Sequence, residues 1–186
     1  MIKKYPVKKS VYIQSVGRLL PHRIGQILKE LGYETWINPR QGNDLDLKVW
    51  YRGTLIFVAE VINWSIGSNL SDERFRSMIN NLSNYSCDKV LIYTVLKGNK
   101  VHEFKKNGIK TLEIGYQLLP RYFYNFFKKK RQITKRRIDS NRTRKDIKNK
   151  LECFISSLSL KSLNKETFTQ LSDALSRYHQ YQFDKH

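Results

Sequence analysis

The sequence predicts an α/β domain followed by a basic, helical C-terminal extension. Helix-type and strand-type patterns alternate up to about residue 114, and the β-branched apolar run at 89–96 is typical of a buried strand. Positive charge gathers after this part of the chain. One domain with an appendage accounts for 186 residues. We therefore expect an αβ core over residues 1–116 and a basic, helical extension over 117–186.

The core is expected to begin with a helix over residues 16–31, where leucines and isoleucines recur at helical spacing. Gly32 is a stop signal, and Pro21 suits a first turn or a kink. Residues 33–37 are typical of a short strand. The Asn-Pro-Arg-Gln-Gly-Asn stretch at 38–43 indicates a turn.

Two further strands, 44–51 and 55–62, flank Arg52-Gly53-Thr54, which predicts a β-hairpin with a three-residue loop. In that register Asp46 lies opposite Glu60. Side chains directly opposite are about 5 Å apart at Cβ, which is unfavourable for two carboxylates unless they share a cation or a proton. The pair is therefore a candidate metal site.

Period-two alternation defines the two faces of this hairpin. One face carries Asp44, Asp46, Lys48 and Trp50 from the first strand with Ile56, Val58, Glu60 and Ile62 from the second. The other face is an apolar floor. Glu60 is thus an acid in a strand of the buried type, which is costly without compensation. Lys48 on the same face is either a solvated lysine, a partner for Glu60 or a catalytic cation.

A helix over 72–85, the strand at 89–96, a short helix over 102–107 and a strand over 109–114 complete the expected core. A helix is then expected from 117 to about 137. Two amphipathic helices follow, one with an apolar stripe from 147 to 158 and one after Asn164. They form a helical hairpin that packs on the core or on a second subunit, so a homodimer is a candidate assembly.

The charge predicts a polyanionic partner, and nucleic acid is the first candidate. Lys and Arg number 35 against 16 Asp and Glu, a net charge of +19. Between residues 117 and 150 there are 13 Lys or Arg and two acids. Arg40, Arg74 and Arg76 could add phosphate contacts. The candidate nucleic-acid-binding residues are Lys128, Lys129, Lys130, Arg131, Lys135, Arg136 and Arg137.

Other classes of protein fit the sequence less well. Apolar runs are far shorter than the ~20 residues that span a bilayer, so no membrane association is expected. The N-terminus has no apolar signal-peptide core, and we expect a cytoplasmic protein. Cys87 and Cys153 stand apart and suggest neither a disulfide framework nor a zinc site.

The segments 42–47 (Gly-Asn-Asp-Leu-Asp-Leu) and 58–65 (Val-Ala-Glu-Val-Ile-Asn-Trp-Ser), with Arg52-Gly53 between them, resemble the PD-(D/E)xK nuclease superfamily. Restriction endonucleases and archaeal Holliday-junction resolvases belong to it. The order helix, three strands, helix, strand is also similar to that family's core, over about half of the chain. The resemblance implies a restriction-endonuclease-like fold. It also implies Mg²⁺- or Mn²⁺-dependent hydrolysis of DNA phosphodiesters, with branched DNA as one substrate, and Asp46 and Glu60 as metal ligands.

The sequence departs from the family at the lysine of the (D/E)xK element, which falls on Ile62. An aliphatic side chain can neither orient water nor stabilise charge on a phosphate. Lys48 is a candidate replacement, Asp44 an auxiliary metal ligand, and Asn63 a weak substitute. Two hypotheses follow: an Mg/Mn-dependent endodeoxyribonuclease, or a catalytically inactive DNA-binding protein that retains the nuclease fold.

Overall fold

The structure is a computed structural model that describes residues 9–39, 44–64, 69–123 and 136–162. It divides into two units, residues 1–150 and 151–186, and the first contains both sheets. The expected helix after Asn164 lies outside the described residues. So do five of the candidate nucleic-acid-binding residues, Lys128, Lys129, Lys130, Arg131 and Lys135.

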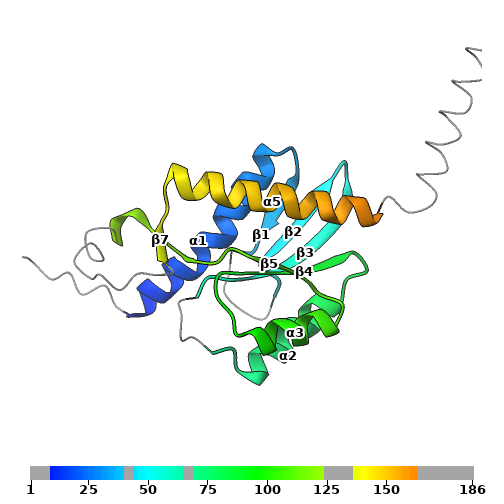
Figure 1. Cartoon of the computed structure of the whole chain (residues 1–186), viewed down its shortest axis with the longest axis horizontal. Helices are drawn as coiled ribbons and strands as arrows, with labels where there is room; N and C mark the ends of the chain where they lie inside the picture. Colours follow the sequence, from blue (N-terminus) through cyan, green and yellow to red (C-terminus); the bar gives the residue numbers. More distant parts are fainter. Residues whose placement is uncertain (1–8, 40–43, 65–68, 124–135, 163–186) are drawn as a thin grey trace, which may run out of the picture. The chain divides into compact units, whose positions relative to one another are not determined.

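A five-stranded mixed sheet forms the centre of the first unit (Figure 1). Its spatial order follows the chain, with antiparallel pairing from β1 to β3 and parallel pairing from β3 to β5. The parallel strands need crossovers, and α2 and α3 supply them. The strands are β1 (Glu34–Ile37), β2 (Leu47–Tyr51), β3 (Thr54–Ile62), β4 (Asp88–Tyr93) and β5 (Lys110–Glu113).

Helices cover both faces of this sheet, so the mixed α/β class is as predicted. The helix α1 (Lys9–Glu30) lies on one face, and α2 (Asp72–Ser83) and α3 (Gly98–Lys106) lie on the other (Figure 1). Gly32 follows α1 with φ +88°, a conformation that favours glycine and ends the helix. The predicted order of helix, three strands, helix and strand is observed.

The β2–β3 hairpin has the predicted register but not the predicted loop. Arg52 and Gly53 alone form the turn, with φ of +50° and +75°, as in the twisted two-residue turns that suit hairpins. Trp50 pairs with Leu55, whereas Val49 pairs with Phe57, so the register shifts by one residue. Beyond this bulge the pairing is the one expected for a three-residue loop, and its continuation places Asp46 opposite Glu60.

The two faces of β3 bury different apolar groups. Val58 and Ile62 belong to a core cluster beneath α2 and α3 that also includes Met78 and Phe104. The bulge turns Leu55, in place of the expected Ile56, toward this cluster. The opposite face of β3 is buried as well, through Phe57, Ala59 and Val61. The strand β3 contacts α1, whose Leu20, Ile24 and Ile27 are also buried.

A second, two-stranded sheet corrects the prediction of a helix over 117–137. The segment Gln117–Leu119 is β6, and it pairs in parallel with β7 (Arg136–Ile138). The side chain of Asn63 bonds both backbone groups of Leu118, which holds this segment extended. That long-range contact overrides the helical spacing of the aromatic residues. Within its described residues, the C-terminal extension therefore combines these two strands with the helix α5 (Asn141–Ser162).

Gly25 permits the close approach of α1 to β1, and this gives a first prediction. A Cβ at this position would lie 2.5 Å from Cδ1 and 2.8 Å from Cγ1 of Ile37. Although alanine favours a helix by about 1 kcal/mol over glycine, the clash outweighs that gain. We expect Gly25→Ala to lower the free energy of unfolding by about 1 kcal/mol in urea titrations. Gly98→Ala, where the added Cβ meets open space, should cost nothing; equal stability of the two variants would contradict the close approach.

Candidate metal site

The fold brings Asp46 and Glu60 together, as the sequence predicts. Glu60 lies in β3 and is completely buried, and Asp46 lies just before β2 and is half-buried. The backbone N–H of Val61 donates to Oδ2 of Asp46 at 2.8 Å, and Nδ2 of Asn81 donates to Oε1 of Glu60 at 2.9 Å. The two carboxyl groups are close enough for the charge of Asp46 to act on Glu60. Both acids are thus held in fixed orientations.

Burial controls the protonation of this pair. Burial, and then the charge of Asp46, raises the pKa of Glu60 to about 8, against the opposing effects of Asn81 and Arg74. Burial also raises the pKa of Asp46, which the Val61 N–H, Glu60 and Arg74 partly offset. Near neutral pH the metal-free pair therefore retains one proton.

Oε2 of Glu60 is the atom of this site that lacks compensation. Within the part of the chain that the structure describes, this oxygen is buried and receives no hydrogen bond from a donor. The guanidinium of Arg74 approaches it from α2, with Nη2 3.9 Å away, and the Arg74 side chain is 41% exposed. A buried carboxylate oxygen beside a second carboxylate fits a hard divalent cation, because Mg²⁺ and Mn²⁺ prefer oxygen ligands.

Asp44, the expected auxiliary ligand, does not join the pair. It is exposed, and its Oδ1 accepts a hydrogen bond from the adjacent Leu45 N–H at 2.8 Å. Among the described residues, no three His, Cys, Asp or Glu side chains gather closely enough to hold a metal ion. The carboxylates that the fold brings together are therefore those of Asp46 and Glu60.

Lys48 shares the face of Val58 but makes a different contact from the one expected. Its Nζ lies 5.0 Å from the centroid of the Trp36 ring and 5.1 Å from that of Tyr85. These cation–π contacts hold the ammonium between β1 and the end of α2. Arg74 is the cation whose charge lowers the pKa of both acids.

Ile62, at the expected lysine position, and Asn63, its expected weak substitute, both have structural roles. Ile62, at the lysine position, is 4% exposed and packs in the core cluster with Val58 and Met78. Asn63 bonds the backbone of Val16 and Leu118 on the other side of the sheet. Ile62 is therefore a packing residue, and Asn63 a structural hydrogen-bonding residue.

Sequence reasoning did not place Arg74 and Asn81 at the site. Both lie on α2, and their spacing with the buried Met78 corresponds to one side of a helix. That periodicity was the available signal, because two polar residues bordering an apolar stripe are expected near the sheet. Their pairing with Glu60 depends on how α2 crosses β3, which no local pattern specifies.

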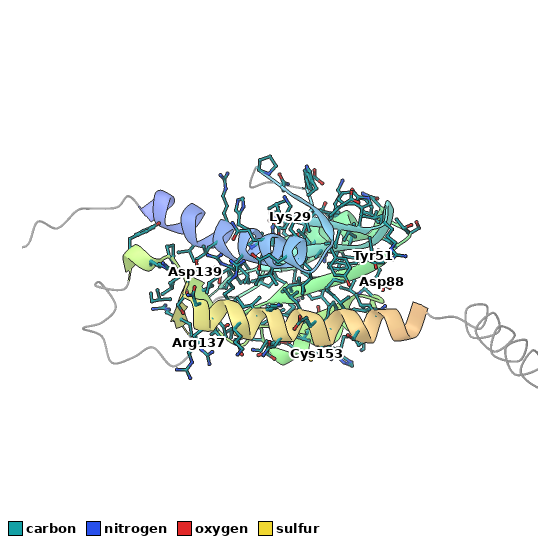
Figure 2. All side chains as sticks on the ribbon, turned by 90° about the horizontal axis from the view of Figure 1, so that it is seen from above. Lys29, Tyr51, Asp88, Arg137, Asp139 and Cys153 are labelled. Atoms are coloured by element: carbon teal, nitrogen blue, oxygen red, sulfur yellow. The ribbon has the colours of Figure 1, made fainter. Side chains whose placement is uncertain are left out.

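Of the candidate basic residues, Arg136 and Arg137 lie in the described β7. The Arg137 guanidinium lies 4.3 Å from the centroid of the Tyr116 ring, and its Nη1 is 3.8 Å from Oδ2 of Asp146. Arg137 lies beside the start of α5, near Asp139 (Figure 2). Of the candidate basic residues, Arg137 is therefore held in place by Tyr116 and Asp146.

Comparison with known proteins identifies no family. No family model matches the sequence, and no curated protein matches it. A similar solved structure is the crystal structure of a protein of unknown function, AF1548, at 16% sequence identity and a TM-score of 0.40. The match covers 53% of this chain and 59% of that one, less than two thirds of its length.

Among the described residues no helix is long and apolar enough to cross a bilayer.

Proposed function

We propose that this protein is a DNA-binding, restriction-endonuclease-like enzyme that hydrolyses DNA phosphodiesters with Mg²⁺ or Mn²⁺ held by Asp46 and Glu60. One observation carries the proposal: a completely buried glutamate faces a second carboxylate, and its Oε2 has no donor among the described residues. Burying an uncompensated acid is costly, so such a pair is expected where it has a role. The net charge of +19 supports a polyanionic substrate.

Two carboxylates suit the proposed cation as ligands, and neighbouring residues hold these carboxylates in place. When bound, Mg²⁺ or Mn²⁺ would polarise a phosphate oxygen and lower the pKa of a bound water. Asp46 and Glu60 supply the ligand oxygens. The Val61 N–H and the Asn81 amide fix the two carboxylates, as groups behind a metal's ligands commonly do.

Arg74 is our candidate for the charge that the motif lysine supplies in the family. It is partly exposed, it lies next to Glu60, and a guanidinium can form two parallel hydrogen bonds with a phosphate. Its position on α2 differs from the motif position on β3, which Ile62 occupies. Lys48 is the alternative, although its ammonium is already held between two rings.

A second candidate function is DNA binding without catalysis. The burial of Ile62 in the core favours it, because the motif's lysine position is a packing position here. Such a protein would keep the fold and the basic surface but lack the cation that stabilises the transition state. Under either function we expect DNA as the partner, and a homodimer would present two sites to two strands.

Cleavage assays on branched, duplex and single-stranded DNA with Mg²⁺ or Mn²⁺ test the proposal. We expect the wild-type protein to cut at least one of these substrates. Asp46→Asn and Glu60→Gln should each lower the rate at least about 100-fold, because each removes a carboxylate ligand of the proposed metal ion. Glu73→Gln, which neutralises an exposed acid of α2, is the matched control and should cut normally.

The other outcomes are equally decisive. Intact DNA in all three assays, with binding retained, would establish the non-catalytic alternative. Cleavage that survives both acid variants would place the activity elsewhere or in a contaminant. Comparing Arg74→Gln with Lys48→Gln then identifies the cation, and we expect the larger loss of rate for Arg74→Gln.

A further inference from the structure

A hollow of about 740 Å³ opens beside the first turn of α5, apart from the acidic pair. We call it the arginine hollow, because Arg121, Arg137 and Arg142 line it together with Asp139, Ser140 and Thr143. The three arginines come from three elements: the 3₁₀ helix at Arg121–Phe123, β7, and α5. Three successive elements of the described chain thus place three arginines around one hollow.

Two of these arginines, Arg121 and Arg137, are positioned by contacts with neighbouring residues. Nε of Arg121 donates to the backbone oxygen of Asp139 at 3.1 Å, which fixes the side chain through one of its five N–H groups. The Arg137 guanidinium lies 4.3 Å from the centroid of the Tyr116 ring and 3.8 Å from Oδ2 of Asp146, and Arg142 is exposed. Pre-positioned guanidinium groups lose little side-chain entropy when they bind.

The acid in the hollow does not cancel this charge. Asp139 is 8% exposed and pairs with Arg23 of α1, whose Nε donates to Oδ1 at 3.0 Å and whose Nη2 bonds Oδ2. The Ser140 and Thr143 side chains close the first turn of α5 through reciprocal bonds to each other's backbone N–H. Arg121, Arg137 and Arg142 therefore give the hollow a net positive charge.

We propose that the arginine hollow binds phosphate groups of a nucleic-acid backbone, as an anchoring site separate from the acidic pair. Guanidinium groups bind phosphate oxygens through paired, charge-assisted hydrogen bonds, and three arginines line this hollow. The proposal rests on the proposed function in taking DNA as the partner, but it requires neither metal nor cleavage.

The exposed aromatic residues favour nucleic acid over a lipid surface. Among the described residues, the large apolar side chains that are exposed are Tyr51 and Tyr122, and Tyr122 is 65% exposed directly after Arg121 in the chain. Tyrosine rings provide a stacking surface for bases. Membrane-surface segments instead present an apolar helix face with Trp, Phe or Leu.

Binding of labelled single- and double-stranded DNA, measured by fluorescence anisotropy in EDTA over a range of salt, tests this site. The test variant is Arg121→Gln/Arg142→Gln. Its control, Arg52→Gln/Lys105→Gln, removes the same charge from exposed positions outside the hollow. We expect the test variant to bind at least about 10-fold more weakly, with a log–log salt slope smaller by about two. The control should lose less than about threefold.

Two further variants keep the result interpretable. Arg142→Gln alone changes an exposed residue, so it should fold normally and lose at least about threefold in affinity. Arg121→Lys/Arg142→Lys retains the charge and should recover part of the binding. A test variant that binds DNA as tightly as its control would overturn the proposal. So would a defect limited to vesicles of phosphatidylserine, which would identify a lipid site instead.

The failures of the two proposals are distinguishable. Weakened DNA binding by the hollow variants, with no cleavage by the wild-type protein, supports the hollow and removes the nuclease. Metal-dependent cleavage together with unchanged binding by the hollow variants does the reverse. A wild-type protein that binds no DNA removes both, and Mn²⁺ binding at Asp46 and Glu60 would then remain as a separate measurement.

Discussion

In metal-free buffer, the free energy of unfolding is expected to fall by on the order of 3 kcal/mol between pH 5 and pH 8.5 through Glu60 alone. The folded protein holds the Glu60 proton with a pKa of about 8, whereas the ordinary value is 4.5. Below pH 4.5 both states are protonated, and the stabilisation is fully present. As the pH rises, the unfolded chain releases this proton first, so stability is lost progressively until the pH passes 8.

Urea unfolding of the wild type and Glu60→Gln, at several pH values in EDTA, measures this effect. Glutamine has the shape of the protonated acid and does not titrate, so the variant should lose most of the fall in stability. Glu73→Gln changes an exposed acid and should follow the wild type. Equal pH slopes for the wild type and Glu60→Gln would show that Glu60 is not the titrating group.

The pH dependence of stability also shows whether Asp46 and Glu60 bind a metal ion or only share a proton. A divalent ion competes with the proton, so Mn²⁺ should stabilise the wild type more at pH 8 than at pH 5. Glu60→Gln should gain little at either pH. If Mn²⁺ has no effect on the wild type, the carboxyl pair is a proton site and the metal proposal fails.

The register of the hairpin was predictable although its loop was not. The turn chemistry of Gly53 and the apolar strands on either side predict a hairpin, but Arg52 gives no signal for the φ of +50° that it adopts. A two-residue turn and the bulge after Val49 together restore the predicted register. The predicted pairing of Asp46 with Glu60 was therefore correct, whereas the three-residue loop from which it was predicted was wrong.

Long-range contacts account for what the sequence could not predict at the site and in the extension. Arg74 and Asn81 reach Glu60 only because α2 crosses β3 at that point. The helical spacing of the apolar and aromatic residues after Gln117 predicts a helix, yet the segment Gln117–Leu119 forms β6. The cause lies more than fifty positions earlier in the chain, in the side chain of Asn63. Local patterns predict the type of an element, but here a buried polar contact between distant residues determines that a strand forms.

Replacing Asn63 by alanine should therefore lower the free energy of unfolding by about 3–5 kcal/mol. The side chain is 3% exposed, and its Nδ2 donates to the backbone oxygens of Val16 at 2.6 Å and Leu118 at 2.8 Å. Its Oδ1 accepts from the Leu118 N–H at 2.8 Å. Alanine would remove the partner of two buried backbone groups of Leu118, at about 1–3 kcal/mol each, and one of the bonds to the Val16 oxygen of α1.

Guanidinium chloride unfolding of Asn63→Ala checks this value, with Asn80→Ala on the exposed side of α2 as the matched control. The control should stay within about 0.5 kcal/mol of the wild type. Asn63→Asp keeps the acceptor but has no donor for Val16 and Leu118 when ionised, so it should also be strongly destabilised. Under conditions where Asn63→Ala is folded, it should still bind Mn²⁺ through Asp46 and Glu60. A loss of metal binding with little loss of stability would instead place Asn63 at the metal site, which its contacts on the other side of the sheet contradict.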